Sequence, residues 1–165
     1  MFVRQLDHVN IATPRFSETL EFYKRVLQMN VGPSPIGPHG AFLHDAAGAA
    51  CIHVASVTAE SVDRLLTTNL AHRTREETDP ATGFATLYGG GAVDHIAFNC
   101  DGLEHTLERF RRDKVPHRYF FIEMGSVHQI FLRDPNGIIL ELRFFETVSP
   151  DILSGIQRGG IESPA

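Results

Sequence analysis

The chain has 165 residues, of which 42% are hydrophobic and 21% are charged, as is ordinary for a globular protein of one domain or two small modules. Its formal net charge of −5 argues against nucleic acid or an anionic membrane as a partner. No apolar run approaches the ~20 residues that span a bilayer, and the start MFVRQLDHVN turns polar too soon for a secretory signal. We therefore expect a cytoplasmic protein with no nucleic acid and no membrane among its partners.

The first half of the chain is typical of one strand, one helix and a hairpin. Alternation of apolar and polar residues predicts a strand over 5–12. Apolar residues at three- and four-residue steps predict a helix over about 17–28. The Pro/Gly-rich segment 31–40 is expected to break regular structure. Two hairpin strands joined by DAAG follow, the second over 49–57.

The second half repeats this order after a linker over about 59–90, which holds a further predicted helix near 60–68. The turn sequence DPNG is expected to join the last two strands. The tail over 151–165 has little periodicity and is predicted to be a loose extension. The expected elements are a strand, a helix and three strands, over 92–100, 103–114, 118–123, 127–133 and 138–145.

The order is doubled because the sequence itself repeats. LDHVNI and VDHIAF place their histidines, His8 and His95, at an offset of 87. TLEFYKR and TLERFRR keep that offset, and FLHDAAG and FLRDPNG follow at an offset of 89. We therefore predict an α+β fold of two β-α-β-β-β modules. Module one covers about 3–58 and module two about 91–146, within a single domain over 1–150.

Four side chains of the metal-ligand type stand at matched positions of the two copies. His8 and His95 lie in the first strands, whereas His53 and Glu141 lie in the last strands, 45 and 46 positions later. A single histidine in a strand is more often a hydrogen-bonded core residue, but the matched pairing favours a shared cavity. Burying such groups unpaired costs several kcal/mol, and a divalent ion removes that cost. Histidine and glutamate suit Zn, Fe, Co, Ni or Mn, so we predict one such ion.

These motifs resemble the vicinal oxygen chelate superfamily, which contains glyoxalase I, methylmalonyl-CoA epimerase, bleomycin-resistance proteins, fosfomycin-resistance enzymes and extradiol dioxygenases. The similarity rests on LDHVNIAT, FYKRVLQMNVG, VDHIAF and HQIFLRDPNGIILELRF, across about residues 3–146. It implies a half-open mixed β-barrel with helices outside, around a divalent ion whose usual ligands map onto His8, His95 and Glu141. Members of the family often dimerise, so we expect a homodimer, with each site within one chain or shared by two.

Two departures from the family pattern bear on the reaction. His53 stands where glyoxalase I and the epimerase usually have Glu or Gln, so we interpret it as a fourth ligand or as an acid/base. Phe131 stands where extradiol and fosfomycin enzymes commonly have a tyrosine. We therefore expect a glyoxalase-like lyase or isomerase with Glu141 and His53 as catalytic residues, acting on a small carbonyl or enediolate-forming substrate. An Fe(II) extradiol-type ring-cleaving dioxygenase and a non-enzymatic, ligand-sequestering protein stay open as alternatives.

Further side chains are candidate contacts for a small-molecule substrate. Two asparagines share a face with the histidine of their strand, and an arginine lies two residues beyond Glu141. In each case, ordinary hydrogen bonding in the core or at the rim is the alternative. The predicted substrate-binding residues are Asn10, Asn99, Gln129, Phe131 and Arg143.

Overall fold

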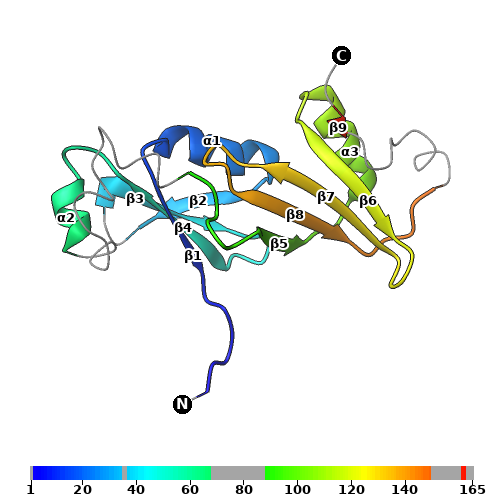
Figure 1. Cartoon of the computed structure of the whole chain (residues 1–165), viewed down its shortest axis with the longest axis horizontal. Coiled ribbons are helices and arrows are strands. Elements are labelled where there is room, and N and C mark those ends of the chain that lie inside the picture. The colour runs from blue at the N-terminus through cyan, green and yellow to red at the C-terminus, as the bar shows by residue number, and fades with distance from the viewer. Residues whose placement is uncertain (1, 35–36, 68–87, 150–160, 163–165) are drawn as a thin grey trace. The chain divides into compact units, whose positions relative to one another are not determined.

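The computed structural model describes residues 2–34, 37–67, 88–149 and 161–162. The chain divides into two compact units, Met1–Tyr88 and Gly89–Ala165. Each unit contains one mixed sheet and a helix that packs on it (Figure 1). Most of the predicted linker over 59–90 lies outside the described residues, apart from α2 (Val62–Leu66) near its start.

The first unit has a four-stranded sheet in the order β1-β4-β3-β2. β1 runs parallel to β4, and the other neighbours are antiparallel. A short 3-10 turn at Gly37–His39 precedes β3. The main elements are β1 (Val9–Thr13), α1 (Phe16–Val26), β2 (Asn30–Pro33), β3 (Gly40–His44) and β4 (Ala50–Ser56).

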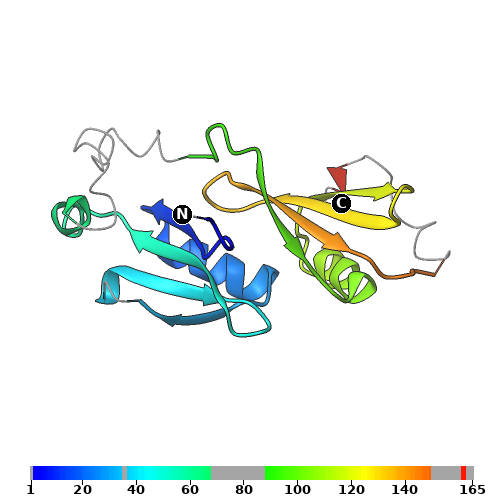
Figure 2. The ribbon, with the colours of Figure 1, turned by 90° about the horizontal axis from the view of Figure 1, so that it is seen from below.

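Helix α1 lies along one face of this sheet (Figure 2). Its apolar stripe buries Tyr23 and Val26 completely or nearly so, and the strands bury Leu43, Ile52 and Val54. Because side chains alternate along a strand, His53, between Ile52 and Val54 on β4, points to the opposite face of the sheet. The packing of α1 therefore turns the candidate ligand away from the helix.

The prediction that 31–40 lacks regular structure is wrong for its first residues, which belong to β2. Among the described strands, β2 lies at the edge of the sheet and pairs with β3. Pro33 occupies its last position, where the missing N–H removes no hydrogen bond from the interior of a ladder. A proline-rich segment is therefore compatible with a strand at the edge of a sheet.

The second unit repeats the arrangement in the order β5-β8-β7-β6-β9. β5 runs parallel to β8, and the other neighbours are antiparallel. The α+β class and the two β-α-β-β-β modules predicted from the sequence are thereby confirmed. The elements are β5 (His95–Asn99), α3 (Leu103–Arg112), β6 (His117–Ile122), β7 (Val127–Arg133), β8 (Ile139–Phe144) and, within the predicted loose tail, β9 (Ile161–Glu162).

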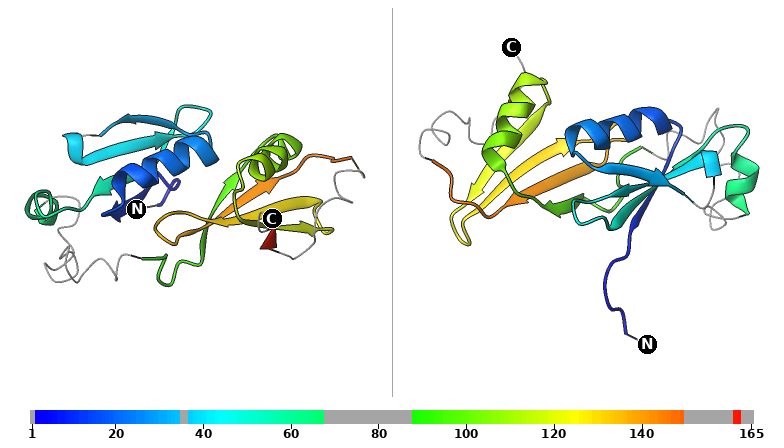
Figure 3. Two further views of the ribbon diagram at one scale, coloured as in Figure 1. Left: turned by 90° about the horizontal axis from the view of Figure 1, so that it is seen from above. Right: turned by 180° about the vertical axis from the view of Figure 1, so that it is seen from behind.

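Helix α3 lies on one side of the second sheet (Figure 3). Its Leu103 and Phe110 are fully buried, as are Ile130 and Leu140 of the strands. The Phe110 ring contacts the His117 ring of β6 with centroids 5.3 Å apart. The alternate residues of the same strands lie on the face away from α3, and this open face carries the polar residues of the candidate site. No helix in the described segments is long and apolar enough to cross a membrane.

Candidate metal centre

His95 and Glu141 meet on the open face of the second sheet. β5 and β8 are parallel neighbours, and Ala97 of β5 is opposite Glu141 of β8. Because side chains alternate along a strand, His95, two residues before Ala97, is on the same face of the sheet as Glu141. Nε2 of His95 lies 2.9 Å from Oε2 of Glu141. Nδ1 of the same ring lies 2.8 Å from Oδ2 of Asp94. Each ring nitrogen therefore has a carboxylate oxygen beside it.

Glu141 is the buried member of this group, with only 5% of its surface exposed. The amide of Gln129 donates a hydrogen bond to its Oε1 at 2.5 Å, and Nε of Arg143 lies 3.6 Å from the same oxygen. A buried carboxylate needs such partners because water no longer solvates it. The two side chains orient the carboxylate, with Oε1 toward them and Oε2 toward His95.

The environment of His95 favours its protonated form. The hydrogen bond with Asp94 is the largest effect and raises the pKa of His95 above its ordinary value. Desolvation opposes it, and the negative charge of Glu141 raises the pKa further. A proton and a metal ion compete for the same nitrogen. Metal binding at this position is therefore expected to release a proton and to weaken at acidic pH.

His8 has the same local arrangement in the first unit. Its Nδ1 lies 2.6 Å from Oδ2 of Asp7, as Nδ1 of His95 lies beside Asp94. The LDHVNI and VDHIAF repeats thus preserve the aspartate as well as the histidine. An aspartate that accepts the Nδ1 proton leaves Nε2 as the nitrogen for a ligand, as in many metal-binding histidines.

His53 lies on β4, buried to 3% exposure, among partners of the first unit. Its Nε2 forms a hydrogen bond with Oγ of Ser34 at 2.8 Å, and its ring stacks on Phe42 with centroids 4.6 Å apart. The edge of the His8 ring faces it, with centroids 6.2 Å apart. Burial, followed by the nearby His8, lowers the pKa of His53. The neutral ring is therefore the stable form near pH 7.

The pair in the second unit fits a divalent ion. Two ligand atoms at ~2.1 Å from one ion and about 90° apart around it lie about 3 Å from each other, and the 2.9 Å between His95 and Glu141 matches this arrangement. Within the described residues, no group of three or more His, Cys, Asp or Glu side chains is placed to hold a metal. Each unit thus brings together two of the four predicted ligands: His8 with His53, and His95 with Glu141.

The predicted substrate contacts divide between the units in the same way. Gln129 and Phe131 line a hollow of about 680 Å³ on the open face of the second sheet. Arg143 and Asn99 are opposite each other on β8 and β5, outside the lining of that hollow. Asn10 lies in the first unit, opposite His53 on the parallel neighbour strand.

Several residues of these sites were not predicted from the sequence. Asp7 and Asp94 carry a signal, because both copies of the repeat place Asp directly before His. Arg118, which lines the hollow on the second sheet, also carries a signal, because it alternates with buried residues along β6. Ser34 has none, because its bond to His53 depends on how β2 packs beside the other strands.

The sequence matches the family profile of the Glyoxalase/Bleomycin resistance protein/Dioxygenase superfamily over residues 5–142. The chain belongs to this superfamily. The resemblance recognised in the sequence is thereby confirmed. The superfamily contains many enzymes and also non-enzymatic proteins, and its members typically bind a divalent metal and small molecules and often dimerise. A comparison with curated protein sequences gives no significant match.

Solved structures with the superfamily fold resemble this chain over most of their length. A virulence protein from Salmonella typhimurium is 15% identical with a TM-score of 0.58, covering 88% of this chain and 100% of that one. A fosfomycin resistance protein from Listeria monocytogenes is 14% identical with a TM-score of 0.56, covering 92% and 98%. A lactoylglutathione lyase from Agrobacterium tumefaciens is 15% identical with a TM-score of 0.54, covering 93% and 98%. Identities this low show a shared fold alone.

Proposed function

We propose that this protein is a metal-dependent lyase or isomerase of the glyoxalase type, acting on a small carbonyl or enediolate-forming substrate. The observation that carries the proposal is the group formed by Asp94, His95 and Glu141. Nε2 of the histidine lies 2.9 Å from the buried carboxylate, and its Nδ1 is oriented by the aspartate. His95 and Glu141 would hold a divalent ion directly, and His8 and His53 would complete its ligands, within one chain or from a second copy.

A bound divalent ion supplies a Lewis acid that polarises a carbonyl oxygen and acidifies the neighbouring C–H bond. The carboxylate of Glu141 is the base for this proton, and Gln129 keeps it in one orientation. Where His53 is not a ligand of the ion, it is the second proton carrier, because its lowered pKa leaves the ring neutral and able to accept a proton. Ser34 fixes the plane of that ring.

A ring-cleaving dioxygenase is the second candidate, favoured by the bond between Ser34 and His53. If Nε2 of His53 stays with Ser34, the ligands are His8, His95 and Glu141, the two-histidine, one-carboxylate set of Fe(II) oxygenases. Phe131 weighs against this reading. It lies directly opposite Glu141 in the ladder and offers no hydroxyl to an oxygen-derived intermediate.

Metal analysis of anaerobically purified protein tests the shared part of both candidates. We expect one divalent ion per chain. The affinity for the ion should fall by at least about 100-fold in His95→Ala and Glu141→Gln, because loss of a residue that only hydrogen-bonds to a ligand already lowers metal affinity by about 10–100-fold. His105→Ala, which removes an exposed histidine of α3, should bind the ion as the wild type does. Equal metal content in all four proteins would refute the proposed site.

Activity under nitrogen separates the two candidates. With Zn, Ni, Co or Mn, the protein should catalyse exchange of solvent deuterium at the carbon beside the carbonyl of a 2-oxoaldehyde–thiol adduct. Glu141→Gln should abolish this exchange. Oxygen uptake with iron on a catechol, without exchange on the adduct, would contradict the glyoxalase type and favour the dioxygenase. Absence of both activities in metal-loaded protein would leave a ligand-sequestering protein.

A further inference from the structure

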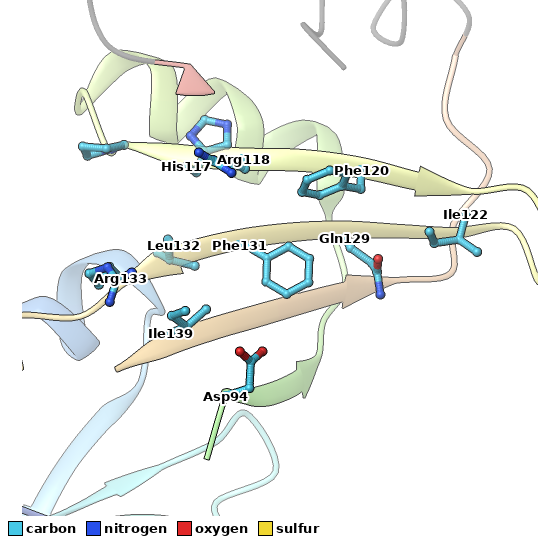
Figure 4. A pocket seen from close by; sticks show the side chains of 11 residues that line it. Asp94, His117, Arg118, Phe120, Ile122, Gln129, Phe131, Leu132, Arg133 and Ile139 are labelled. Carbon is cyan, nitrogen blue, oxygen red and sulfur yellow. The ribbon is translucent and has the colours of Figure 1, made fainter. Parts of the chain in front are cut away.

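The hollow on the open face of the second sheet has the size of a small-molecule site. Its volume of about 680 Å³ lies within the ~300–1,000 Å³ typical of such sites. All of its lining comes from the second unit, chiefly from β6 and β7 (Figure 4). Its shape and charge can therefore be described from that unit alone.

A row of three side chains crosses the open face of this sheet. Arg118 of β6 is opposite Phe131 of β7, which is in turn opposite Glu141 of β8. Directly opposed residues of antiparallel strands share one face. Neighbouring strands are about 4.8 Å apart, so two spacings place the backbones of Arg118 and Glu141 about 10 Å from each other. Phe131 separates the cationic end of the row from the end with the proposed metal ligands.

The middle of the hollow is apolar and aromatic. The rings of Phe120 and Phe131 meet edge to face with centroids 5.7 Å apart, and the edge of the His95 ring meets Phe131 at 5.8 Å. Phe120 is 36% exposed, although a large apolar side chain is usually covered. A ligand with a planar apolar body about one ring wide can therefore cover Phe131 and extend from the Arg118 end of the row to the Glu141 end.

The far end of the hollow is cationic. Arg118 is exposed, and among the described residues none forms a hydrogen bond or ion pair with its side chain. Arg133 lies at the same end (Figure 4) and uses Nη1 for a hydrogen bond to the carbonyl of Gly137 at 2.8 Å. Asp94 directly precedes β5 and lies on the opposite side of Phe131 from Arg118 (Figure 4). An anionic group is therefore attracted to one end of the hollow and repelled from the other.

We infer that this hollow binds a small carboxylate with a planar apolar body, the carboxylate on the guanidinium of Arg118 and the ring over Phe131. The forked N–H groups of arginine match the two oxygens of a carboxylate. The end of the ligand opposite the carboxylate then lies at His95 and Glu141. This last point rests on the proposed function, whereas the binding of the carboxylate does not. Arg118 is thus a specificity residue for the substrate.

Binding of two matched probes to the metal-free, full-length protein tests the inference. 3-Phenylpropanoate and its neutral amide, 3-phenylpropanamide, have the same shape and differ in charge, and their affinities are measured by isothermal titration calorimetry. We expect the wild type to bind the acid about tenfold more tightly than the amide, as a hydrogen bond to a charged group allows. Arg118→Gln should bind both alike.

Two further variants separate charge from packing. Arg111→Gln, which removes an exposed arginine of α3 outside the hollow, should keep the preference for the acid. Phe131→Ala should weaken both probes equally, because the ring contacts the apolar body. Equal affinity of the two probes for the wild type, or an unchanged preference in Arg118→Gln, would overturn the inference. Because no metal is present, neither result depends on the proposed reaction, which the metal and exchange measurements test by themselves.

Discussion

Two aspartates act on His8 and His95 at the scale of single residues. Asp7 and Asp94 each accept a hydrogen bond from Nδ1 of the following histidine, so that Nε2 is the nitrogen directed to other partners. Because Asp and His are sequence neighbours in both copies of the repeat, this orientation depends on a local contact and not on distant segments. The same bond makes His95 easier to protonate.

Asp94→Asn should therefore change the titration of His95 in the metal-free protein. The pKa of His95 is raised chiefly by Asp94, so the ion pair stabilises the fold fully below the ordinary value of ~6.5 and is lost as the pH rises through the raised value. We expect the variant to lower this pKa toward its ordinary value, as followed by the ring proton signals in NMR. Asp101→Asn, an exposed residue after β5, is the control. An unchanged titration in Asp94→Asn would contradict this account.

The turn between β7 and β8 determines, at the scale of elements, which face receives Glu141. Oδ1 of Asp134 accepts hydrogen bonds from the N–H groups of Asn136 and Ile138, both at 2.8 Å. Gly137 has a φ of +81°, which glycine adopts without a steric penalty. These contacts set the register that places Glu141 opposite Phe131, and a slip by one residue would turn the carboxylate toward α3.

The start of α3 depends on a side chain from beyond the end of β8. Gly102 at the N-cap has no side chain to accept the first N–H groups of the helix. The carboxylate of Glu146 accepts them instead, from Gly102 and, at 3.0 Å, from Leu103. A carboxylate at this position also interacts favourably with the positive end of the helix dipole.

Glu146→Ala should therefore lower the free energy of unfolding by about 1 kcal/mol, the usual effect of losing an N-cap partner. Urea denaturation followed by circular dichroism measures it. Glu108→Ala, on the exposed side of α3, should change the free energy by less than about 0.5 kcal/mol, as for most surface substitutions. Equal stability of the two variants would mean that Glu146 does not cap the helix.

The predicted ligands belong to two units at the scale of the whole molecule. His8 and His53 lie in Met1–Tyr88, and His95 and Glu141 lie in Gly89–Ala165. Two protein ligands rarely suffice to hold a divalent ion against water, because catalytic sites usually have three. We therefore expect the proposed ion to need ligands besides His95 and Glu141, and His8 and His53 are the candidates.

His8→Ala should accordingly abolish the stabilisation by metal even though His95 and Glu141 are intact. A ligand at 100 times its dissociation constant adds about 2.7 kcal/mol to the stability of the form that binds it. When Zn, Ni, Co or Mn is added, we expect this stabilisation to raise the melting temperature of the wild type and of His39→Ala. The melting temperature of His8→Ala should rise little. A full rise in His8→Ala would mean that the second unit binds the ion without the first.

Local signals in the sequence were sufficient for most of the helices and strands, whereas the candidate ligands stay a prediction. Alternation and turn sequences act over a few residues and recur in both copies of the repeat, so the α+β class and both modules could be predicted. Strand parity left open whether His128 or Gln129 faces the candidate site, and the resemblance to the superfamily favoured Gln129. The same signals placed the start of the first strand too early, because it was predicted over 5–12, whereas β1 begins at Val9, where its pairing with β4 starts.

Contacts between distant segments were decided only by the tertiary structure. The bonds of Ser34 to His53 and of Glu146 to the start of α3 join residues whose neighbourhood results from sheet order and helix packing. The row from Arg118 to Glu141 likewise depends on the register of three strands. The sequence by itself determined which side chains each strand presents on a face, because alternation is a property of the extended backbone. The tertiary structure decided which of them meet, because that depends on pairing between strands far apart in the chain.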